Sequence, residues 1–252
     1  HRWEQMEQHW HDSLAGAPTL LQLPQKADRK TEGGVHREVV KVNIDEALYS
    51  QLEQFTRTVG STKYVTLLTA YQAAIYRYSG QRDLLIGSPL LGRTDHRFAD
   101  VVGYFINTVV LRARMNDSQD FKSLLNQTSR QVLGAIDNQD YLFSHLIDKL
   151  KPVRHAGATP FFQAWFNLNK YWQFNKSSQQ LSATAKTDSG LVMERYDIGG
   201  QEANFDLVLL MEDNDQQLRG EIKYNADIYD QQMIEDMARD FVSILEQVIQ
   251  FP

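Results

Sequence analysis

Two strand patterns near the end of the chain most constrain its fold, because only the short polar segment 213–217 separates them. Residues 205–212 (FDLVLLME) and 218–225 (LRGEIKYN) are both rich in the apolar and β-branched residues that strands favour. Strands joined by so short a turn pair as an antiparallel hairpin. We therefore expect a sheet that contains at least one antiparallel pair.

Helix and strand patterns interleave along the rest of the chain without strict βαβ alternation. In the helical segments the apolar residues recur every three or four positions, whereas the strand segments are short and densely apolar. We expect helices over residues 44–59, 65–78, 119–136, 143–150 and 233–248, and further strands over residues 83–88, 101–114, 161–169 and 191–198. This order predicts an α/β or α+β fold with a mixed β-sheet flanked by helices.

Two segments fall outside this pattern. Residues 1–34 end at a glycine pair and contain too few apolar residues for a core of their own. We interpret them as a connector helix and loop that packs on one domain, residues 35–252. Residues 170–190 are polar and lack periodicity, so we expect an exposed arm that moves or contacts another lobe.

The composition excludes several classes of function. The chain has no cysteine, which excludes disulfides, thiolate metal sites and cysteine nucleophiles. No stretch approaches the roughly 18 uninterrupted apolar residues of a membrane helix. The net charge is −6, and the basic residues are scattered rather than gathered on one face, which disfavours nucleic acid as a partner. We expect a cytoplasmic protein that binds neither nucleic acid nor membranes.

Histidine motifs offer no convincing catalytic or metal site. His9 and His11 are two apart, so on a helix they point to different faces and lack further ligands at helical spacing. His96 and Asp100 match the His-x-x-x-Asp of some acyltransferases, but Val101 stands where the tight turn needs glycine. Surface histidines are therefore expected, and we assign no catalytic residue and no metal ligand.

Six segments carry a resemblance to a known family. They are residues 9–24 (HWHDSLAGAPTLLQLP), 64–93 (ending in IGSPLLGR), 102–112 (VGYFINTVVLR), 138–148 (NQDYLFSHLID), 159–169 (TPFFQAWFNLN) and 204–230. In this order they resemble the C-terminal lobe of a nonribosomal peptide synthetase condensation domain, in the chloramphenicol acetyltransferase-like superfamily. The third segment is similar to the fifth core motif, (I/V)GxFVNTxxxR, and the fourth to the sixth, (H/N)QDxPFE. Leu142 and Ser144 replace the proline and glutamate of the sixth motif, and Thr159 replaces an asparagine of the seventh.

The resemblance implies a chloramphenicol acetyltransferase-like lobe that works with partners. In condensation domains two such lobes form a V, and the N-terminal lobe carries the catalytic His-His-x-x-x-Asp-Gly, which this sequence lacks. Phosphopantetheine arms of peptidyl or acyl carrier proteins bring the acyl donor and the aminoacyl acceptor into a tunnel between the lobes. The expected partners are the N-terminal lobe, carrier proteins and a neighbouring adenylation domain. No cofactor is expected to bind this chain directly, and the chain alone should be inactive.

The same resemblance places Asn107 and Ser88 at the tunnel, as groups that position the amine or a thioester carbonyl, with Arg93 as a weaker candidate. Independently, Asn107 and Thr108 are polar residues inside an apolar run, and such side chains must be paired or face a cavity. The chain is either a fragment of a longer synthetase, which is the interpretation we favour, or a naturally truncated lobe that serves as a scaffold or docking surface. A non-catalytic docking module and an independent acetyltransferase-like enzyme that uses His96 remain as alternatives.

Overall fold

The computed structural model describes residues 1–27, 35–93, 95–170, 184–186, 192–194 and 205–250. The helices are α1 (Arg2–Leu14), α2 (Glu46–Thr58), α3 (Lys63–Ser79), α4 (Phe121–Asp137), α5 (Phe143–Leu150) and α6 (Gln231–Gln250), with a short 3₁₀ helix η1 (His96–Phe98). The strands are β1 (Arg37–Ile44), β2 (Asp83–Leu90), β3 (Asn107–Arg114), β4 (Ala164–Lys170), β5 (Thr184–Lys186), β6 (Val192–Glu194), β7 (Leu207–Asp213) and β8 (Leu218–Asn225).

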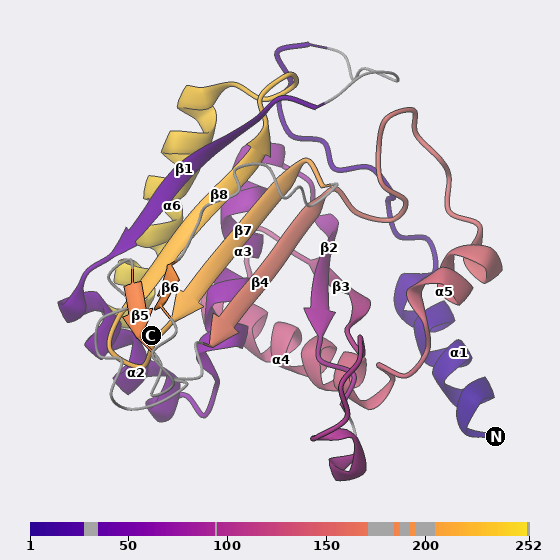
Figure 1. Ribbon diagram of the computed structural model, residues 1–252. Helices are drawn as coiled ribbons and strands as arrows, with labels where there is room; N and C mark the ends of the chain where they lie inside the picture. The colour runs from indigo at the N-terminus through magenta and orange to yellow at the C-terminus, as the bar shows by residue number, and fades with distance from the viewer. Residues whose placement is uncertain (28–34, 94, 171–183, 187–191, 195–204, 251–252) are drawn as a thin grey trace.

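Six of these strands form one mixed sheet in the order β1-β8-β7-β4-β2-β3. β7 and β8 form the expected antiparallel hairpin, and β1 and β3 pair antiparallel with β8 and β2. β4 runs parallel to both of its neighbours, β2 and β7. In Figure 1, helices α2, α3, α4 and α6 lie behind the sheet, and α1 and α5 lie beside its β3 edge. The mixed sheet flanked by helices predicted from the sequence is thus confirmed.

The helices begin and end at residues that the sequence marks as caps. The side chains of Asp45, Thr62 and Asp120 each accept a hydrogen bond from a backbone N–H in the first turn of α2, α3 and α4. Helix α3 ends at Gly80, whose φ of +62° favours glycine. α3 packs against α4 and α6 and is buried on several sides, as its nearly continuous apolar sequence predicts.

The N-terminal segment packs against the core of the sheet domain. Met6, Trp10 and Leu14 of α1 are buried in the same hydrophobic cluster as the sheet residues. Leu21 and Leu23, in the strap of residues 15–27 that follows α1, belong to the same cluster. Trp10 Nε1 also donates a hydrogen bond to the carbonyl of Asn138 at 3.1 Å. The interpretation of residues 1–34 as a connector, with a division at residues 34 and 35, stays a prediction.

The strand expected over residues 101–114 is wrong in its first half. β3 begins only at Asn107, which pairs with Leu90, the last residue of β2. Because β2 ends there, the residues before Asn107 have no strand to pair with. The side chains of Val101, Val102, Tyr104 and Ile106 are exposed. The strand expected over residues 191–198 is described only at 192–194, where it pairs with β5. Most of the arm expected at 170–190 lies outside the described residues.

Candidate functional site in the loop between β2 and β3

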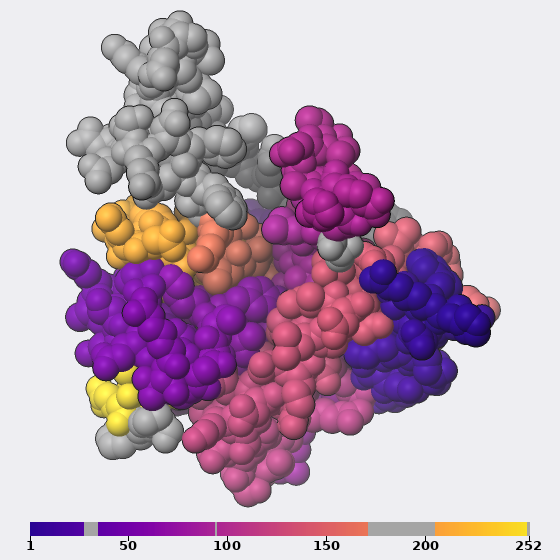
Figure 2. Space-filling view, turned by 90° about the horizontal axis from the view of Figure 1, so that it is seen from below, coloured from indigo at the N-terminus to yellow at the C-terminus, as the bar shows by residue number. Residues whose placement is uncertain are grey.

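The residues with an expected role in function gather at one end of the β2–β3 pair. Ser88 lies opposite Val109, and Thr108 lies opposite Pro89, next to the Leu90–Asn107 pair that ends the ladder. Arg93 is the third residue after the end of β2, in the connection to β3. We call this connection the β2–β3 loop; its described residues are 91–93 and 95–106. Figure 2 shows the loop, in magenta, standing out from the body of the molecule.

The Asn107 side chain is paired at both ends of its amide. Its Nδ2 donates to the carbonyls of Gln139 at 2.7 Å and Tyr141 at 3.0 Å. Its Oδ1 accepts from the backbone N–H of Phe143 at 3.4 Å. Asn107 therefore ties the start of β3 to the turn between α4 and α5. This pairing explains why a polar side chain is present in an apolar run, and a contact of Asn107 with substrate stays a prediction.

The Ser88 hydroxyl is fully buried and faces the helix layer. It donates its one proton to the carbonyl of Phe166 on β4, at 2.8 Å. It therefore accepts a hydrogen bond from the Tyr64 hydroxyl of α3, at 2.6 Å. Burial raises the pKa of Tyr64 to about 12, so this donor stays protonated at neutral pH. In the described structure Ser88 joins β2, β4 and α3, and a role of this hydroxyl toward substrate stays a prediction.

Arg93 makes the contacts that hold the β2–β3 loop together. Its guanidinium donates to the carbonyls of Phe98 and Gly103, the latter at 3.4 Å. The guanidinium carbon also lies 4.2 Å from the centre of the Phe105 ring, a cation–π contact. The rings of Phe98 and Phe105 are 5.5 Å apart. One exposed arginine thus holds the two halves of the loop together.

The β2–β3 loop carries an unusual amount of exposed apolar surface. Val102 is 100% exposed, Tyr104 85% and Leu91 73%. The other large apolar residues that are exposed in the loop are Phe98, Val101 and Ile106. A cluster of this kind on an ordered projection is typical of a surface that another protein segment covers.

The histidines that the sequence singled out occupy surface or packing positions. The His96 side chain is 94% exposed in η1, with its Nδ1 3.5 Å from Asp95 Oδ1. His9 packs edge-on against the Trp10 ring, and burial lowers its pKa, although Asp137 and Asp12 oppose that shift. Among the described residues, no group of three histidine, aspartate or glutamate side chains could hold a metal ion.

Two residues fix the N-terminal segment to the sheet domain, and we assigned a role to neither from the sequence. Arg112, the only charged residue between positions 101 and 113, binds both carboxylate oxygens of Asp83 at 2.8 and 2.6 Å. It also donates to the carbonyls of Ser13 and Ala15 at the end of α1. The sequence held one sign of this role: Arg112 is a charged residue inside an apolar strand, and such a charge needs partners.

Gln163 fixes the strap after α1 in the same way. Its Oε1 accepts from the N–H of Leu21 at 2.6 Å, and its Nε2 donates to the carbonyls of Thr19 at 3.1 Å and Thr159 at 2.7 Å. The side chain is fully buried. An amide between Phe162 and Ala164 in an apolar strand was the corresponding signal in the sequence.

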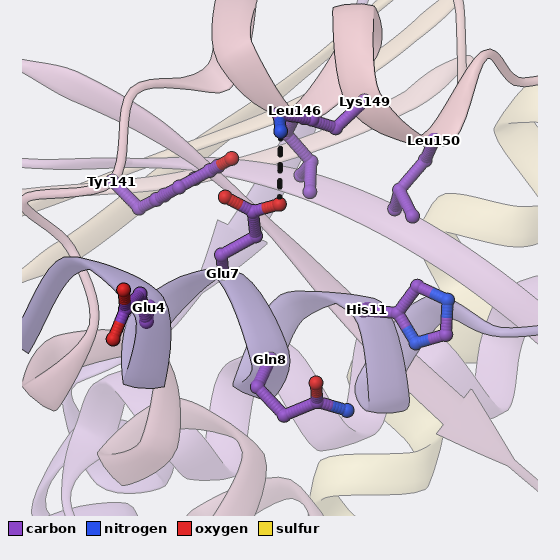
Figure 3. Close-up of a pocket in the computed structure, with 8 residues that line it drawn as sticks. All are labelled: Glu4, Glu7, Gln8, His11, Tyr141, Leu146, Lys149 and Leu150. Atoms are coloured by element: carbon purple, nitrogen blue, oxygen red, sulfur yellow. Dashed lines mark ion pairs between the residues drawn. The ribbon is translucent and has the colours of Figure 1, made fainter. Parts of the chain in front are cut away.

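A groove of about 350 Å³ lies between α1 and α5 (Figure 3). Lys149 Nζ of α5 crosses it and lies 3.2 Å from Glu7 Oε1 of α1. The residues that line it are Glu4, Glu7, Gln8, His11, Tyr141, Leu146, Lys149 and Leu150. The ion pair joins the two helices, and none of the four expected site residues lines this groove.

No helix of the described ranges is both long and apolar enough to span a bilayer.

Comparison with known proteins points to one family. Residues 1–252 match the family model described as "Condensation domain". The chain is 30% identical over 252 residues to tyrocidine synthase 2 of Brevibacillus parabrevis, an alignment that covers 99% of this chain and 7% of that protein. It is also 30% identical over 240 residues to the phosphinothricin tripeptide synthetase PhsB of Streptomyces viridochromogenes, covering 95% of this chain and 20% of that protein. The chain therefore spans a small part of the length of these relatives.

Solved structures share the fold. A four-domain nonribosomal peptide synthetase in its holo form, bound to AMP and glycine, superposes with a TM-score of 0.86 at 20% identity, covering 99% of this chain and 19% of that one. The X-domain in a complex with OxyB from teicoplanin biosynthesis gives a TM-score of 0.85 at 19% identity, covering 100% of this chain and 54% of that one. At these identities the likeness concerns the fold alone.

Proposed function

This chain belongs to the condensation-domain family, and on that premise we propose that it is the C-terminal lobe of a chloramphenicol acetyltransferase-like condensation domain in a nonribosomal peptide synthetase. The chain has 252 residues and covers 54% of the X-domain chain whose fold it shares. This proportion supports one lobe of a two-lobed domain. The connector, residues 1–34, would then lead into the lobe proper, residues 35–252.

The proposed reaction is amide formation between two substrates held as thioesters on carrier proteins. The amine of the acceptor aminoacyl group attacks the carbonyl carbon of the donor thioester. The new C–N bond forms as the C–S bond breaks, the donor phosphopantetheine leaves as a thiol, and the amine gives up one proton. The histidine that assists this step belongs to the His-His-x-x-x-Asp-Gly motif of the N-terminal lobe, and this chain has no such motif.

In this proposal the chain supplies the second wall of the tunnel. Asn107 and Thr108, at the start of β3, and Arg93, in the β2–β3 loop, would position the acceptor amine or a thioester carbonyl. Ser88 would act through the strands that it joins. The proposed partners are the N-terminal lobe, carrier proteins with their phosphopantetheine arms, and an adjacent adenylation domain.

The observation that carries the proposal is the exposed apolar surface of the β2–β3 loop beside the fifth-motif asparagine. A lobe interface would cover this surface and place Asn107 next to the tunnel. The test is binding of the N-terminal lobe of the same domain, produced separately, to variants of this chain measured by calorimetry. Val102→Ser and Tyr104→Ser should each weaken binding about tenfold or more, since each removes a large apolar contact from a buried interface.

Val39→Ser provides the matched control, because Val39 is a half-exposed apolar residue on the edge strand β1. It should leave the affinity unchanged. Equal affinity of all three variants and the unaltered chain would contradict the proposed interface.

A second candidate is a docking module that binds a protein partner without chemistry of its own. The X-domain that shares this fold is solved in a complex with OxyB, which supports such a use of the fold. Binding of a protein partner by the complete two-lobed domain, together with no condensation of loaded carrier proteins, would favour this candidate.

A further inference from the structure

The base of the β2–β3 loop is closed by a contact that only glycine permits. Gly92 has a φ of +64°, and a Cβ added to it would lie 1.9 Å from the carbonyl oxygen of Phe105. The two ends of the loop therefore approach each other at van der Waals distance, two residues before β3 begins. The loop leaves the sheet through a fixed neck.

Gln139 lies at this neck and uses every polar group it has. Its Oε1 accepts from the N–H of Gly92 at 3.3 Å. Its Nε2 donates to the carbonyl of Ile136 at 2.9 Å, in the last turn of α4, and its backbone carbonyl accepts from Asn107 at 2.7 Å. One residue thus connects the end of α4, the neck of the loop and the start of β3.

We propose that Gln139 is a positioning residue, which fixes the neck of the β2–β3 loop relative to Asn107 through its hydrogen bond from Gly92. Without that bond, the loop keeps the internal contacts of Arg93 but loses its fixed angle to the body. The exposed apolar side chains of the loop then no longer keep a fixed position relative to Asn107. The structural part of the proposal stands on its own, and only its consequence for catalysis rests on the proposed function.

The chain offers a matched control for the loss of this bond. Gln127 is a residue of α4, and its Oε1 accepts a hydrogen bond from the N–H of Arg114 at 3.1 Å. Arg114 lies at the end of β3 opposite to Asn107. Gln127→Met removes the same kind of bond far from the neck. Gln139→Met removes the bond at the neck together with the bond to the Ile136 carbonyl. Gln139→Glu also loses the bond to Ile136 but retains an acceptor for the N–H of Gly92, so the two variants separate the effects of the two bonds.

The first test is residue-resolved hydrogen exchange of the 252-residue chain. In Gln139→Met the amide of Gly92 should exchange about fivefold faster, the factor by which one net hydrogen bond shifts a local opening equilibrium. The amides of residues 103–106 should follow in the same direction. Gln139→Glu should retain most of the protection, and Gln127→Met should leave these amides unchanged. Unchanged exchange in Gln139→Met, or equal acceleration in Gln127→Met, would overturn the proposal.

The second test measures condensation by the complete two-lobed domain. Gln139→Met should lower kcat about fivefold or more while its melting temperature equals that of Gln127→Met, and Gln139→Glu should recover most of the rate. A normal kcat in Gln139→Met would refute the positioning role in catalysis. A two-lobed domain that condenses nothing, with the exchange results as expected, would instead refute the proposed function and leave the structural part intact.

Discussion

Replacing Asn107 by alanine tests whether its three hydrogen bonds hold the turn between α4 and α5. The substitution leaves the carbonyls of Gln139 and Tyr141 and the N–H of Phe143 without their side-chain partner. A net hydrogen bond contributes about 0.5–1.5 kcal/mol, and half-burial lets water replace part of it, so we expect a loss of about 2 kcal/mol in the free energy of unfolding. For a domain of this size, that lowers the melting temperature by about 4–8 °C.

The assay is urea denaturation followed by circular dichroism, with Asn43→Ala as control, because Asn43 is an exposed asparagine of β1. Asn107→Asp should be more destabilising than Asn107→Ala, since a carboxylate would face the two carbonyls that now receive the amide N–H groups. A free energy of unfolding for Asn107→Ala within about 0.5 kcal/mol of that for Asn43→Ala would refute this reasoning, because it would mean that the bonds contribute nothing net.

Two further predictions concern the core. Lys63 Nζ lies 2.5 Å from the buried carboxylate of Asp213; burial opposes ionisation of Asp213, but the contacts with Lys63 prevail and lower its pKa. Its contribution to stability is therefore full above the unfolded pKa of about 3.9 and is lost as the pH falls through the lower folded pKa. Asp213→Asn should therefore cost more stability at pH 7 than at pH 3, and an equal cost at both would contradict the pairing. A Cβ on Gly87 would lie 2.1 Å from the Phe162 ring, so Gly87→Ala should lower the free energy of unfolding by about 1–3 kcal/mol, and a neutral result in urea denaturation would argue against that packing.

The sequence predicted those parts of the fold that depend on local pattern. Helix α3 and the β7–β8 hairpin follow from residue spacing and from the polar turn between the strands. The error over residues 101–106 has a different origin. Their composition is that of a buried strand, but whether they pair depends on where β2 ends, and no local pattern contains that information.

The candidate site, like the fold, was predictable only where local sequence pattern determines it. A polar side chain at Asn107 had to be paired or face a cavity, and the structure pairs it with the turn at residues 139–143, more than 30 positions along the chain. Ser88 lies in a strand whose facing helix could not be identified from sequence, so its contact with Tyr64 was not foreseen. Long-range partners of this kind depend on packing rather than on periodicity.

The most direct test of the proposed function is a condensation assay with loaded donor and acceptor carrier proteins, followed by mass spectrometry of the carrier-bound products. The 252-residue chain alone should form no peptide bond. Addition of the separately produced N-terminal lobe should restore product, and that lobe with the second histidine of its His-His-x-x-x-Asp-Gly motif changed to alanine should not. Product formation by this chain alone would contradict its assignment as a non-catalytic lobe, and a failure to form product with the unaltered N-terminal lobe bound would contradict its role in condensation.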